Sequence, residues 1–345
     1  MCGIFGFAKT SGRQSDNQLD ILKRVFEELT DESSVRGEDS TGFSIMDSEH
    51  RFTYKTLIDS SSLVSKDVWD TDILSRITRD TTIVMGHVRL ATHGSVKVHN
   101  AHPFNVGDVT GVHNGIIYNY NQVAKKLGKS VPEVDSQVLF QSLNRIQMDK
   151  AFESIDGDFA ITWVKDSNRK VHLARESGRP IVVAYWKKAR VLLWASTKAI
   201  MQDAMIRAGL NLPIKSVPED YIFTYDTDNF DSRPNQEQVP FDTISQYSYR
   251  NSVYGGSSWS GRNYNYYSKD SNPSPASSHL ITSGSTDSGR KEICTYCYEY
   301  TPADEIWKDA TGSNVCFDCE YYGDAYREKN SEGGSVDENK NESLF

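Results

Sequence analysis

The amino-acid sequence predicts an α+β fold in which mainly antiparallel sheets are covered by helices. Segments with strand character outnumber segments with helical periodicity along residues 1–225. The strands occur in hairpin-like pairs, and the helices are grouped between those pairs instead of following each strand in turn. Because a regular alternation of strand and helix is typical of parallel sheets, this grouping favours antiparallel pairing.

The first part of the chain is expected to form strands around one amphipathic helix. The helix is expected over residues 16–30, because Leu19, Leu22, Val25, Phe26 and Leu29 recur at helical spacing. Strands are expected at 3–8, 41–46, 51–57, 82–90 and 108–113, with a turn at Asp47-Ser48. The fourth of these runs into a polar loop at 91–105, and the fifth ends at Asn114-Gly115.

The second part of the chain continues with helices and then returns to strands. Helices are expected at 119–127 and 135–146, and Asp135 is a candidate N-cap of the latter because its oxygen can accept from exposed N–H groups. Strands are expected at 159–165, 170–174, 181–186, 191–195 and 221–225, with a helix at 197–208.

The composition divides the chain into four parts. Residues 1–240 read as a globular domain, whereas residues 245–290 contain 14 Ser in 46 residues, without apolar periodicity. Such a segment buries too little apolar surface to offset the entropy of ordering it, so 241–290 is expected to be a flexible linker. An RNA- or condensate-binding segment is the alternative, since Arg and Tyr occur in it. A small module is expected at 291–327 and a disordered tail at 328–345.

Charge and hydropathy exclude several classes of protein. The net charge of −9 and the pI near 5.4 argue against a general nucleic-acid or anionic-membrane surface. No apolar run approaches the roughly 18 residues that a membrane span needs, and the N-terminus lacks the pattern of a signal peptide. The expected location is the cytoplasm, where cysteines stay reduced.

Cys2 is a candidate nucleophile. Removal of Met1 would leave a thiol and a free α-amino group on one residue. With a pKa of about 7.7–8.0, that amine is partly neutral near pH 7 and can accept the thiol proton, directly or through a water. Taken alone, Cys2 fits a small buried residue at the start of an edge strand better than a nucleophile, because buried cysteine is commonest as a small hydrophobe.

Three further segments carry groups suited to an amino-acid substrate. Arg89 presents a planar fork for a carboxylate, with the hydroxyl of Thr92 close in sequence. Asn114 and the N–H of Gly115 form a natural pair of donors for an oxyanion, and Asp135 can hold an ammonium. Each has a structural alternative, namely a surface ion pair, a hairpin turn and a helix N-cap.

The histidines in this region are expected to be structural donors. They are His87, His93, His102 and His113. They lack the His-x-x-x-His spacing with an acidic partner that typifies a metal site.

The order of these motifs behind an N-terminal cysteine resembles a known family. The motifs are Cys2-Gly3-Ile4-Phe5-Gly6, Arg36-Gly37-Glu38-Asp39-Ser40-Thr41-Gly42, Gly86-His87-Val88-Arg89-Leu90-Ala91-Thr92-His93-Gly94, Asn100-Ala101-His102-Pro103 and His113-Asn114-Gly115-Ile116-Ile117. Later segments at 156–160, 174–175 and 195–196 also match. Residues 1–225 thus resemble the glutaminase domain of class II glutamine amidotransferases, N-terminal-nucleophile hydrolases, and most of all that of glucosamine-6-phosphate synthase.

The resemblance implies a fold and a set of roles. The fold is a four-layer αββα sandwich, here with a flexible linker and a small C-terminal zinc-ribbon-like module. Cys2 is the nucleophile, with its own α-amine as base, and Asn114 and Gly115 form the oxyanion hole. The glutamine-binding residues are Arg89, Thr92, His93, Gly115 and Asp135. Hydrolysis of L-glutamine itself requires no cofactor.

Two departures from the family bear on the fate of the ammonia. Leu90 stands where the sugar-phosphate synthase has a tryptophan that helps gate ammonia, which puts that gating in doubt here. No segment after residue 225 resembles an isomerase, phosphoribosyltransferase or synthetase domain. We therefore expect a stand-alone glutaminase subunit that passes ammonia to a separate synthase. The alternatives are a catalytically silent scaffold that recruits partners, and an acylase acting on other amides, which the Arg89/Asp135 pair disfavours.

Four cysteines near the C-terminus predict a metal site. Cys294 and Cys297 form one close pair and Cys316 and Cys319 another, within the spacing typical of structural zinc. A rubredoxin-like iron site has similar ligands and is the alternative. Four thiolates leave no open position for catalysis, so the zinc is expected to fold a module too small for its own core. Eight acids against three bases between residues 291 and 327 make nucleic acid an improbable partner and favour protein docking.

Overall fold

The computed structural model describes most of residues 2–239 and four short segments beyond them. The described ranges are 2–91, 94–176, 178–230, 234–239, 291–293, 300–302, 306–308 and 312–316. Within residues 2–239 the chain forms two antiparallel sheets and helices, so the predicted α+β class is confirmed. The expected linker at 241–290 and the tail at 328–345 lie outside the described residues.

The first sheet has seven strands in the order β11-β9-β10-β1-β4-β2-β3. Their bounds are β1 Gly3–Lys9, β2 Ser40–Met46, β3 Arg51–Thr56, β4 Ile83–Arg89, β9 Val182–Trp186, β10 Val191–Ala195 and β11 Ile214–Ser216. β1 lies in the middle, between β10 and β4, and is buried along its whole length. The start of β1 therefore lies beside the end of β4, where Gly3 pairs with Val88.

The second sheet has six strands in the order β13-β12-β8-β7-β6-β5. Their bounds are β5 Phe104–Val106, β6 Val109–Ile117, β7 Gly157–Lys165, β8 Lys170–Arg175, β12 Tyr221–Asp226 and β13 Asn235–Gln238. The longest ladder joins β6 to β7 over nine paired positions, from Val109 opposite Lys165 to Ile117 opposite Gly157.

Helices cover the outer face of each sheet. The helices are α1 Asp16–Glu32, α2 Ser60–Val64, α3 Tyr120–Lys126, α4 Ser136–Arg145, α5 Met148–Glu153 and α6 Lys198–Arg207, with shorter helical turns at Ser33–Arg36, Trp69–Ile73, Leu74–Arg76, Val98–Asn100 and Lys187–Ala189. In α1 the Ser15 hydroxyl accepts from Gln18 N–H while the Gln18 side chain accepts from Ser15 N–H, a capping box that fixes where the helix begins.

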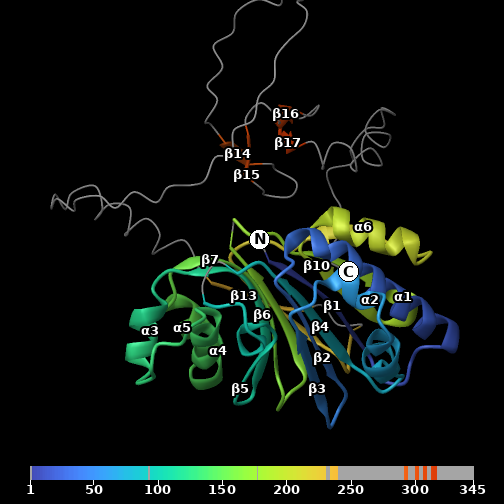
Figure 1. The fold of residues 1–345 in the computed structure, drawn as a ribbon, viewed down its shortest axis with the longest axis horizontal. Helices are drawn as coiled ribbons and strands as arrows, with labels where there is room; N and C mark the ends of the chain where they lie inside the picture. The colour runs from blue at the N-terminus through green and yellow to red at the C-terminus, as the bar shows by residue number, and fades with distance from the viewer. Residues whose placement is uncertain are drawn as a thin grey trace, which may run out of the picture.

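Three clusters of buried side chains separate four layers (Figure 1). One cluster lies between the seven-stranded sheet and α1, α2 and α6. A second lies between the six-stranded sheet and α3, α4 and α5. The third joins the two sheets, with Ile4 and Met85 from one and Val112 and Leu173 from the other. Helices, sheet, sheet and helices thus follow in the order that the family resemblance implies.

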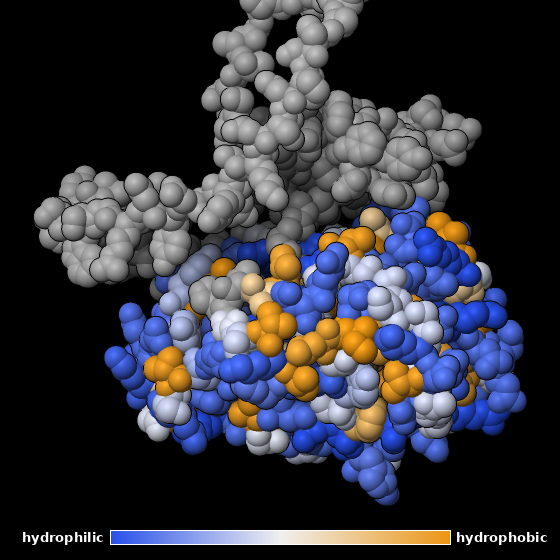
Figure 2. Space-filling view, viewed as in Figure 1, coloured by the Kyte–Doolittle hydropathy of each residue, from blue (hydrophilic) through white to orange (hydrophobic). Residues whose placement is uncertain are grey.

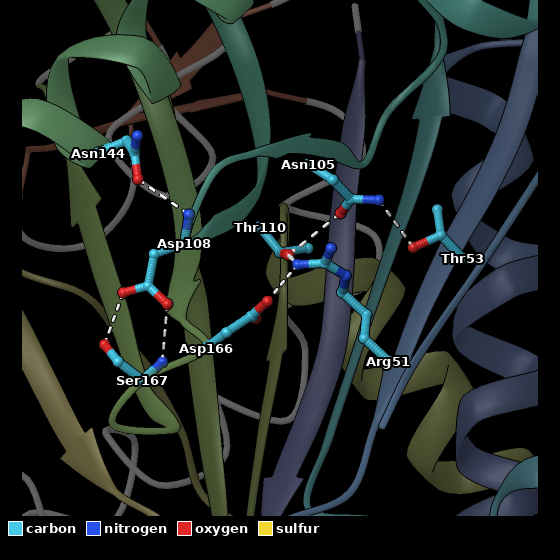
Figure 3. A network of polar contacts seen from close by, with 8 residues as sticks. All are labelled: Arg51, Thr53, Asn105, Asp108, Thr110, Asn144, Asp166 and Ser167. Atoms are coloured by element: carbon cyan, nitrogen blue, oxygen red, sulfur yellow. Dashed lines mark hydrogen bonds and ion pairs between the residues drawn. The ribbon is translucent and has the colours of Figure 1, made fainter. Parts of the chain in front are cut away.

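A polar network ties the two sheets together at the end away from the start of β1 (Figure 3). Arg51 at the start of β3 donates to the Thr110 hydroxyl of β6 at 2.8 Å and pairs with Asp166 just after β7. Asn105 of β5 donates to the Thr53 hydroxyl at 3.1 Å. These contacts join the two sheets at this end of the sandwich, so they hold the sheets in one alignment relative to each other.

The structure differs from the sequence prediction at several short elements. α2, α5, β5, β11 and β13 were not predicted. β6 also runs on to Ile117 through Asn114 and Gly115, which the sequence suggested as the end of the strand. Pairing with β7 supplies the partner that local sequence does not reveal, because Asn114 lies opposite Ala160 and Gly115 opposite Phe159.

The C-terminal segments form two short hairpins. β14 (Lys291–Ile293) pairs with β15 (Tyr300–Pro302), and β16 (Ile306–Lys308) pairs with β17 (Asn314–Cys316). Cys316 is the last residue of β17, whereas Cys294, Cys297 and Cys319 lie outside the described residues.

The face of the molecule drawn in Figure 2 is mainly polar. On the face drawn in Figure 2, apolar side chains lie in small groups among predominantly hydrophilic ones. In the part of the chain that the structure describes, no helix is both long and apolar enough to cross a bilayer.

Candidate active site

Three of the predicted site residues face the layer between the two sheets. Side chains at alternate positions of a strand share a face. The inter-sheet cluster includes Ile4 of β1, Met85 of β4 and Val112 of β6. Cys2 lies two positions before Ile4, Arg89 lies four positions after Met85, and Asn114 lies two positions after Val112. Because each offset is even, the three side chains project toward the same layer as these cluster residues. They lie at one end of it, where β1 begins and where β4 and β6 end.

The Cys2 thiol is held by the residues around the start of β1. Its Sγ donates to the Leu90 carbonyl oxygen at 3.5 Å, and Arg36 Nε donates to the Cys2 carbonyl oxygen at 2.9 Å. Burial raises the pKa of the Cys2 thiol, and this exceeds the opposing effects, which include the positive charges of Arg89 and Arg36. The thiol is therefore protonated at neutral pH, and its use as a nucleophile requires a base.

The segment Arg36–Gly42 fixes the end of β4 as well as Cys2. Asp39 N–H donates to the Arg89 carbonyl oxygen at 3.0 Å, and the Asp39 carboxylate accepts from Ala91 N–H at 2.6 Å. A Cβ on Gly37 would lie 2.4 Å from the Arg89 carbonyl carbon, so only glycine fits against the strand there. This segment resembles a motif of the family, but its local sequence predicts no role for Arg36 or Asp39, because their partners lie far along the chain.

Arg89 is buried, with 3% of its surface exposed. Its Nη1 donates to the Ser95 carbonyl oxygen at 3.3 Å. The alternative of a surface ion pair is therefore wrong for this residue. A buried guanidinium facing the inter-sheet layer suits an anionic group of a ligand. Thr92 and His93, which were expected to join it, lie outside the described residues.

Asn114 offers a buried donor without a partner. The residue is 2% exposed, and its Nδ2 has no hydrogen-bond partner among the residues that the structure describes. A buried amide donor without a protein partner is available to a ligand group that enters the site. The alternative that Asn114-Gly115 forms a hairpin turn is wrong, since both residues lie within β6.

Gly115 occupies a conformation and a space that exclude any side chain. Its φ is +145°, and a Cβ would lie 1.9 Å from the carbonyl oxygen of Asp158 on the neighbouring strand. The backbone can therefore turn beside Asn114 only because the residue is glycine.

Asp135 lies beside the end of β6 and does not cap α4. The residue is 5% exposed, and its Oδ2 accepts from Ile117 N–H at 2.7 Å. Its side chain makes no capping bond, so the predicted N-cap alternative is wrong in that respect. The next residue, Ser136, shares a hydrogen bond of 2.8 Å between its Oγ and Nδ1 of His113. The start of α4 is thus fixed to the strand that carries Asn114.

The described histidines near the site are neutral structural groups. His87 Nε2 donates to the His113 carbonyl oxygen at 3.0 Å, and the His87 ring stacks on His102 with centroids 4.1 Å apart. Burial lowers the pKa of His87 to about 3 and also lowers the pKa values of His102 and His113. Because these rings stay uncharged at neutral pH, they add no competing cation beside Arg89.

None of the described histidines belongs to a cluster of three or more metal-ligating side chains. Among the described residues, only Glu28, Asp31 and Glu32 lie close enough together to suit an ion. Arg207 already pairs with all three carboxylates, at 2.8–3.9 Å.

Comparisons with known proteins agree with this arrangement. The family model described as a glutamine amidotransferase domain matches residues 72–225. A glutamine–fructose-6-phosphate aminotransferase (isomerizing) of Listeria monocytogenes is 28% identical over 208 residues, which cover 56% of this chain and 31% of the relative. The Helicobacter pylori protein of the same name is 26% identical over 214 residues, covering 58% and 33%. The chain thus aligns with about a third of the length of these relatives.

Solved structures share the fold. The glutamine phosphoribosylpyrophosphate amidotransferase of B. subtilis superimposes with a TM-score of 0.52 at 17% identity, over 70% of this chain and half of that chain. A structure described as the allosteric regulatory enzyme of purine biosynthesis gives 0.53 at 18% identity over the same shares. These findings show that residues 72–225 match a glutamine amidotransferase domain and that the chain shares the fold of solved amidotransferases.

Proposed function

We propose that the protein hydrolyses L-glutamine to L-glutamate and ammonia through a thioester on Cys2, and that the ammonia passes to a separate synthase. The observation that carries this proposal is the unpaired, buried Nδ2 of Asn114, which faces the same layer as Cys2 and Arg89. A donor held without a partner in the resting site is ready for an oxyanion that forms only during reaction.

The first half of the reaction forms the thioester. Arg89 binds the α-carboxylate of glutamine and Asp135 its α-ammonium. The α-amine of Cys2, exposed once Met1 is removed, accepts the thiol proton, and the thiolate attacks the side-chain carbonyl carbon. Asn114 Nδ2 and Gly115 N–H donate to the resulting oxyanion. The intermediate collapses with cleavage of the C–N bond, and the α-ammonium returns its proton to the leaving ammonia.

The second half regenerates the enzyme. The free α-amine deprotonates a water, which attacks the thioester carbonyl through a second oxyanion held by the same two donors. Cleavage of the C–S bond releases glutamate, and the thiolate regains a proton. His87 and His102 take no part in these proton transfers, because burial holds their pKa values well below neutrality.

Ammonia release by the full-length protein tests the proposal. We expect purified protein that lacks Met1 to form one glutamate and one ammonia per glutamine consumed, measured with coupled dehydrogenase assays. A protein that binds glutamine without consuming it would instead favour the catalytically silent scaffold.

The acceptor of the ammonia and the cellular location of the protein are proposed from the composition of the sequence. Residues 241–345 contain a Ser-rich stretch and a cysteine-containing module, neither of which resembles an acceptor domain. We propose a separate synthase as the acceptor of the ammonia. The reaction also needs Cys2 as a free thiol, which suits the reducing cytoplasm.

We further propose that Cys294, Cys297, Cys316 and Cys319 bind a structural Zn²⁺. Cys294 and Cys297 fall in the connection between the paired strands β14 and β15, and Cys316 ends β17. The two hairpins are joined by a hydrogen bond of 3.1 Å from Asn314 Nδ2 to Glu292. Each of these two residues stands two positions before a cysteine, so the bond supports a common site for both pairs. Four thiolates would neutralise the ion and fold the module, without a part in glutamine hydrolysis.

Truncation after residue 240 is expected to leave the glutaminase folded and active. The domain is complete by then, because β13 pairs with β12 and Val239 N–H donates to the Asp220 carbonyl oxygen at 2.7 Å. Elemental analysis of the full-length protein should give one zinc, and Cys294→Ser with Cys297→Ser should remove it while ammonia release per mole stays unchanged. An inactive truncated protein would contradict this modular organisation, and iron in place of zinc would overturn the metal assignment.

A further inference from the structure

A compact set of hydrogen bonds converges on Ser95, in the loop that follows β4. Its N–H donates to Glu133 Oε1 at 2.7 Å, and its hydroxyl donates to the same oxygen at 2.5 Å. Its carbonyl oxygen accepts from Asn100 Nδ2 at 2.9 Å and from Arg89 Nη1 at 3.3 Å. These contacts bring together residues that lie up to 44 positions apart in the sequence.

Glu133 connects the two sides of the site. It stands two residues before Asp135, the proposed ammonium-binding group, while Ser95 contacts Arg89, the proposed carboxylate-binding group. The hydrogen bonds from Ser95 and Asn100 lower the pKa of Glu133 to about 2, so its carboxylate is charged throughout the working pH range. His99 Nε2 lies 3.6 Å from the other carboxylate oxygen.

We propose that Glu133 is a positioning residue for glutamine, which orients the guanidinium of Arg89 through Ser95. This inference rests on the proposed glutaminase function, because it assigns Glu133 to recognition of the α-carboxylate of the same substrate. Glu133 touches neither the reacting carbonyl nor Cys2 in this arrangement, and its effect passes through the Ser95 carbonyl.

Glu133 can orient Arg89 because it fixes the direction of the Ser95 peptide. Two donors of Ser95, one backbone and one side chain, are fixed by a single carboxylate oxygen, which leaves the peptide little freedom to rotate. The Ser95 carbonyl oxygen is then fixed as an acceptor for Arg89. Without Glu133 only Asn100 still holds the Ser95 peptide, which gains freedom, so the contact that the Ser95 carbonyl makes with Arg89 is weakened. An Arg89 with more orientational freedom binds a carboxylate more weakly, because ordering it costs entropy on binding.

The expected effect is confined to substrates that carry an α-carboxylate. Glu133→Ala should raise KM for L-glutamine about tenfold, the size of one lost hydrogen bond, with little change in kcat. The α-amide of L-glutamine lacks the carboxylate that Arg89 binds. Its conversion to isoglutamine should therefore have nearly the same kcat/KM in Glu133→Ala as in the unmodified protein, so the preference for glutamine falls about tenfold.

Two further variants separate positioning from a general structural role. Glu133→Gln retains an oxygen acceptor for both Ser95 donors and should keep most of the preference. Glu153→Ala is a matched control, because Glu153 is a comparably exposed acid, 47% against 41% for Glu133, that pairs with Lys150 away from the site. It should leave both substrates unaffected.

The outcomes distinguish this proposal from the proposed function. Suppose that the unmodified protein hydrolyses glutamine, but Glu133→Ala loses activity equally toward both substrates or toward neither. That result would overturn the role of Glu133 and leave the glutaminase function standing. Unmodified protein that releases no ammonia from glutamine would overturn the proposed function, and the role of Glu133 with it.

Discussion

Replacing Cys2 with alanine is expected to abolish ammonia release from glutamine, with a loss of about 10⁴-fold or more. The change removes the atom that forms the thioester. Glutamine should still bind to Cys2→Ala, because Arg89 and Asp135 remain in place. Stopped ammonia assays and calorimetric titration with glutamine measure the two effects separately. Full turnover by Cys2→Ala would refute the covalent mechanism.

The group that accepts the proton of the Cys2 thiol can be identified from the pH dependence of the reaction. Burial raises the pKa of the Cys2 thiol, so the thiol alone supplies little thiolate at neutral pH. If the α-amine of Cys2 is the base, kcat/KM should rise with pH as that amine loses its proton, near its ordinary pKa of about 7.7–8.0, and then level off. A variant with one alanine inserted before Cys2 keeps the thiol but moves the amine away, and it should be as inactive as Cys2→Ala. An active insertion variant would assign the base to another group.

Much of the fold could be predicted because its signals are local, and the candidate site residues were also chosen from local motifs. The periodicity of α1 and the strand at 191–195 needed only neighbouring residues, and the structure places them as expected. Cys2, Arg89 and Asn114 were identified from short motifs, and the alternation of strand side chains then explains why they share one layer.

The remaining features depend on partners far along the chain. Asn114-Gly115 has the composition of a turn, and only its pairing with Ala160 and Phe159 makes it strand. Asp135 has the position of a helix cap, but its carboxylate bonds to Ile117 N–H on the neighbouring strand. Short elements such as β11 are similarly defined by their sheet neighbours. Local propensity cannot anticipate contacts of this kind, because it contains no information on which strands become adjacent.

Replacing Asn114 with alanine is expected to lower kcat about 100- to 1,000-fold with little change in KM. The Nδ2 of Asn114 has no hydrogen-bond partner among the described residues, and this donor acts on negative charge that develops at the substrate oxygen only as the thiolate attacks. Arg89→Ala and Asp135→Ala should show the opposite pattern, since they remove contacts of about 1.5–3 kcal/mol to groups that are charged before reaction begins. Steady-state kinetics on the three variants separates the patterns. One common pattern would contradict the division between binding and chemistry.

The stability of Asn114→Ala tests independently whether the amide donor of Asn114 is unpaired in the folded protein. A buried amide donor without a partner destabilises the folded state by about 1–3 kcal/mol, and alanine relieves that cost while losing some packing. The free energy of unfolding should therefore stay the same or increase, although activity falls. Asn144→Ala is a matched control at the other end of the sandwich, where Asn144 accepts from Asp108 N–H at 2.9 Å. That variant should lose stability and keep its kcat. A strongly destabilised Asn114→Ala would mean that the amide has a structural partner in the resting protein, and its loss of activity would then no longer identify an oxyanion donor.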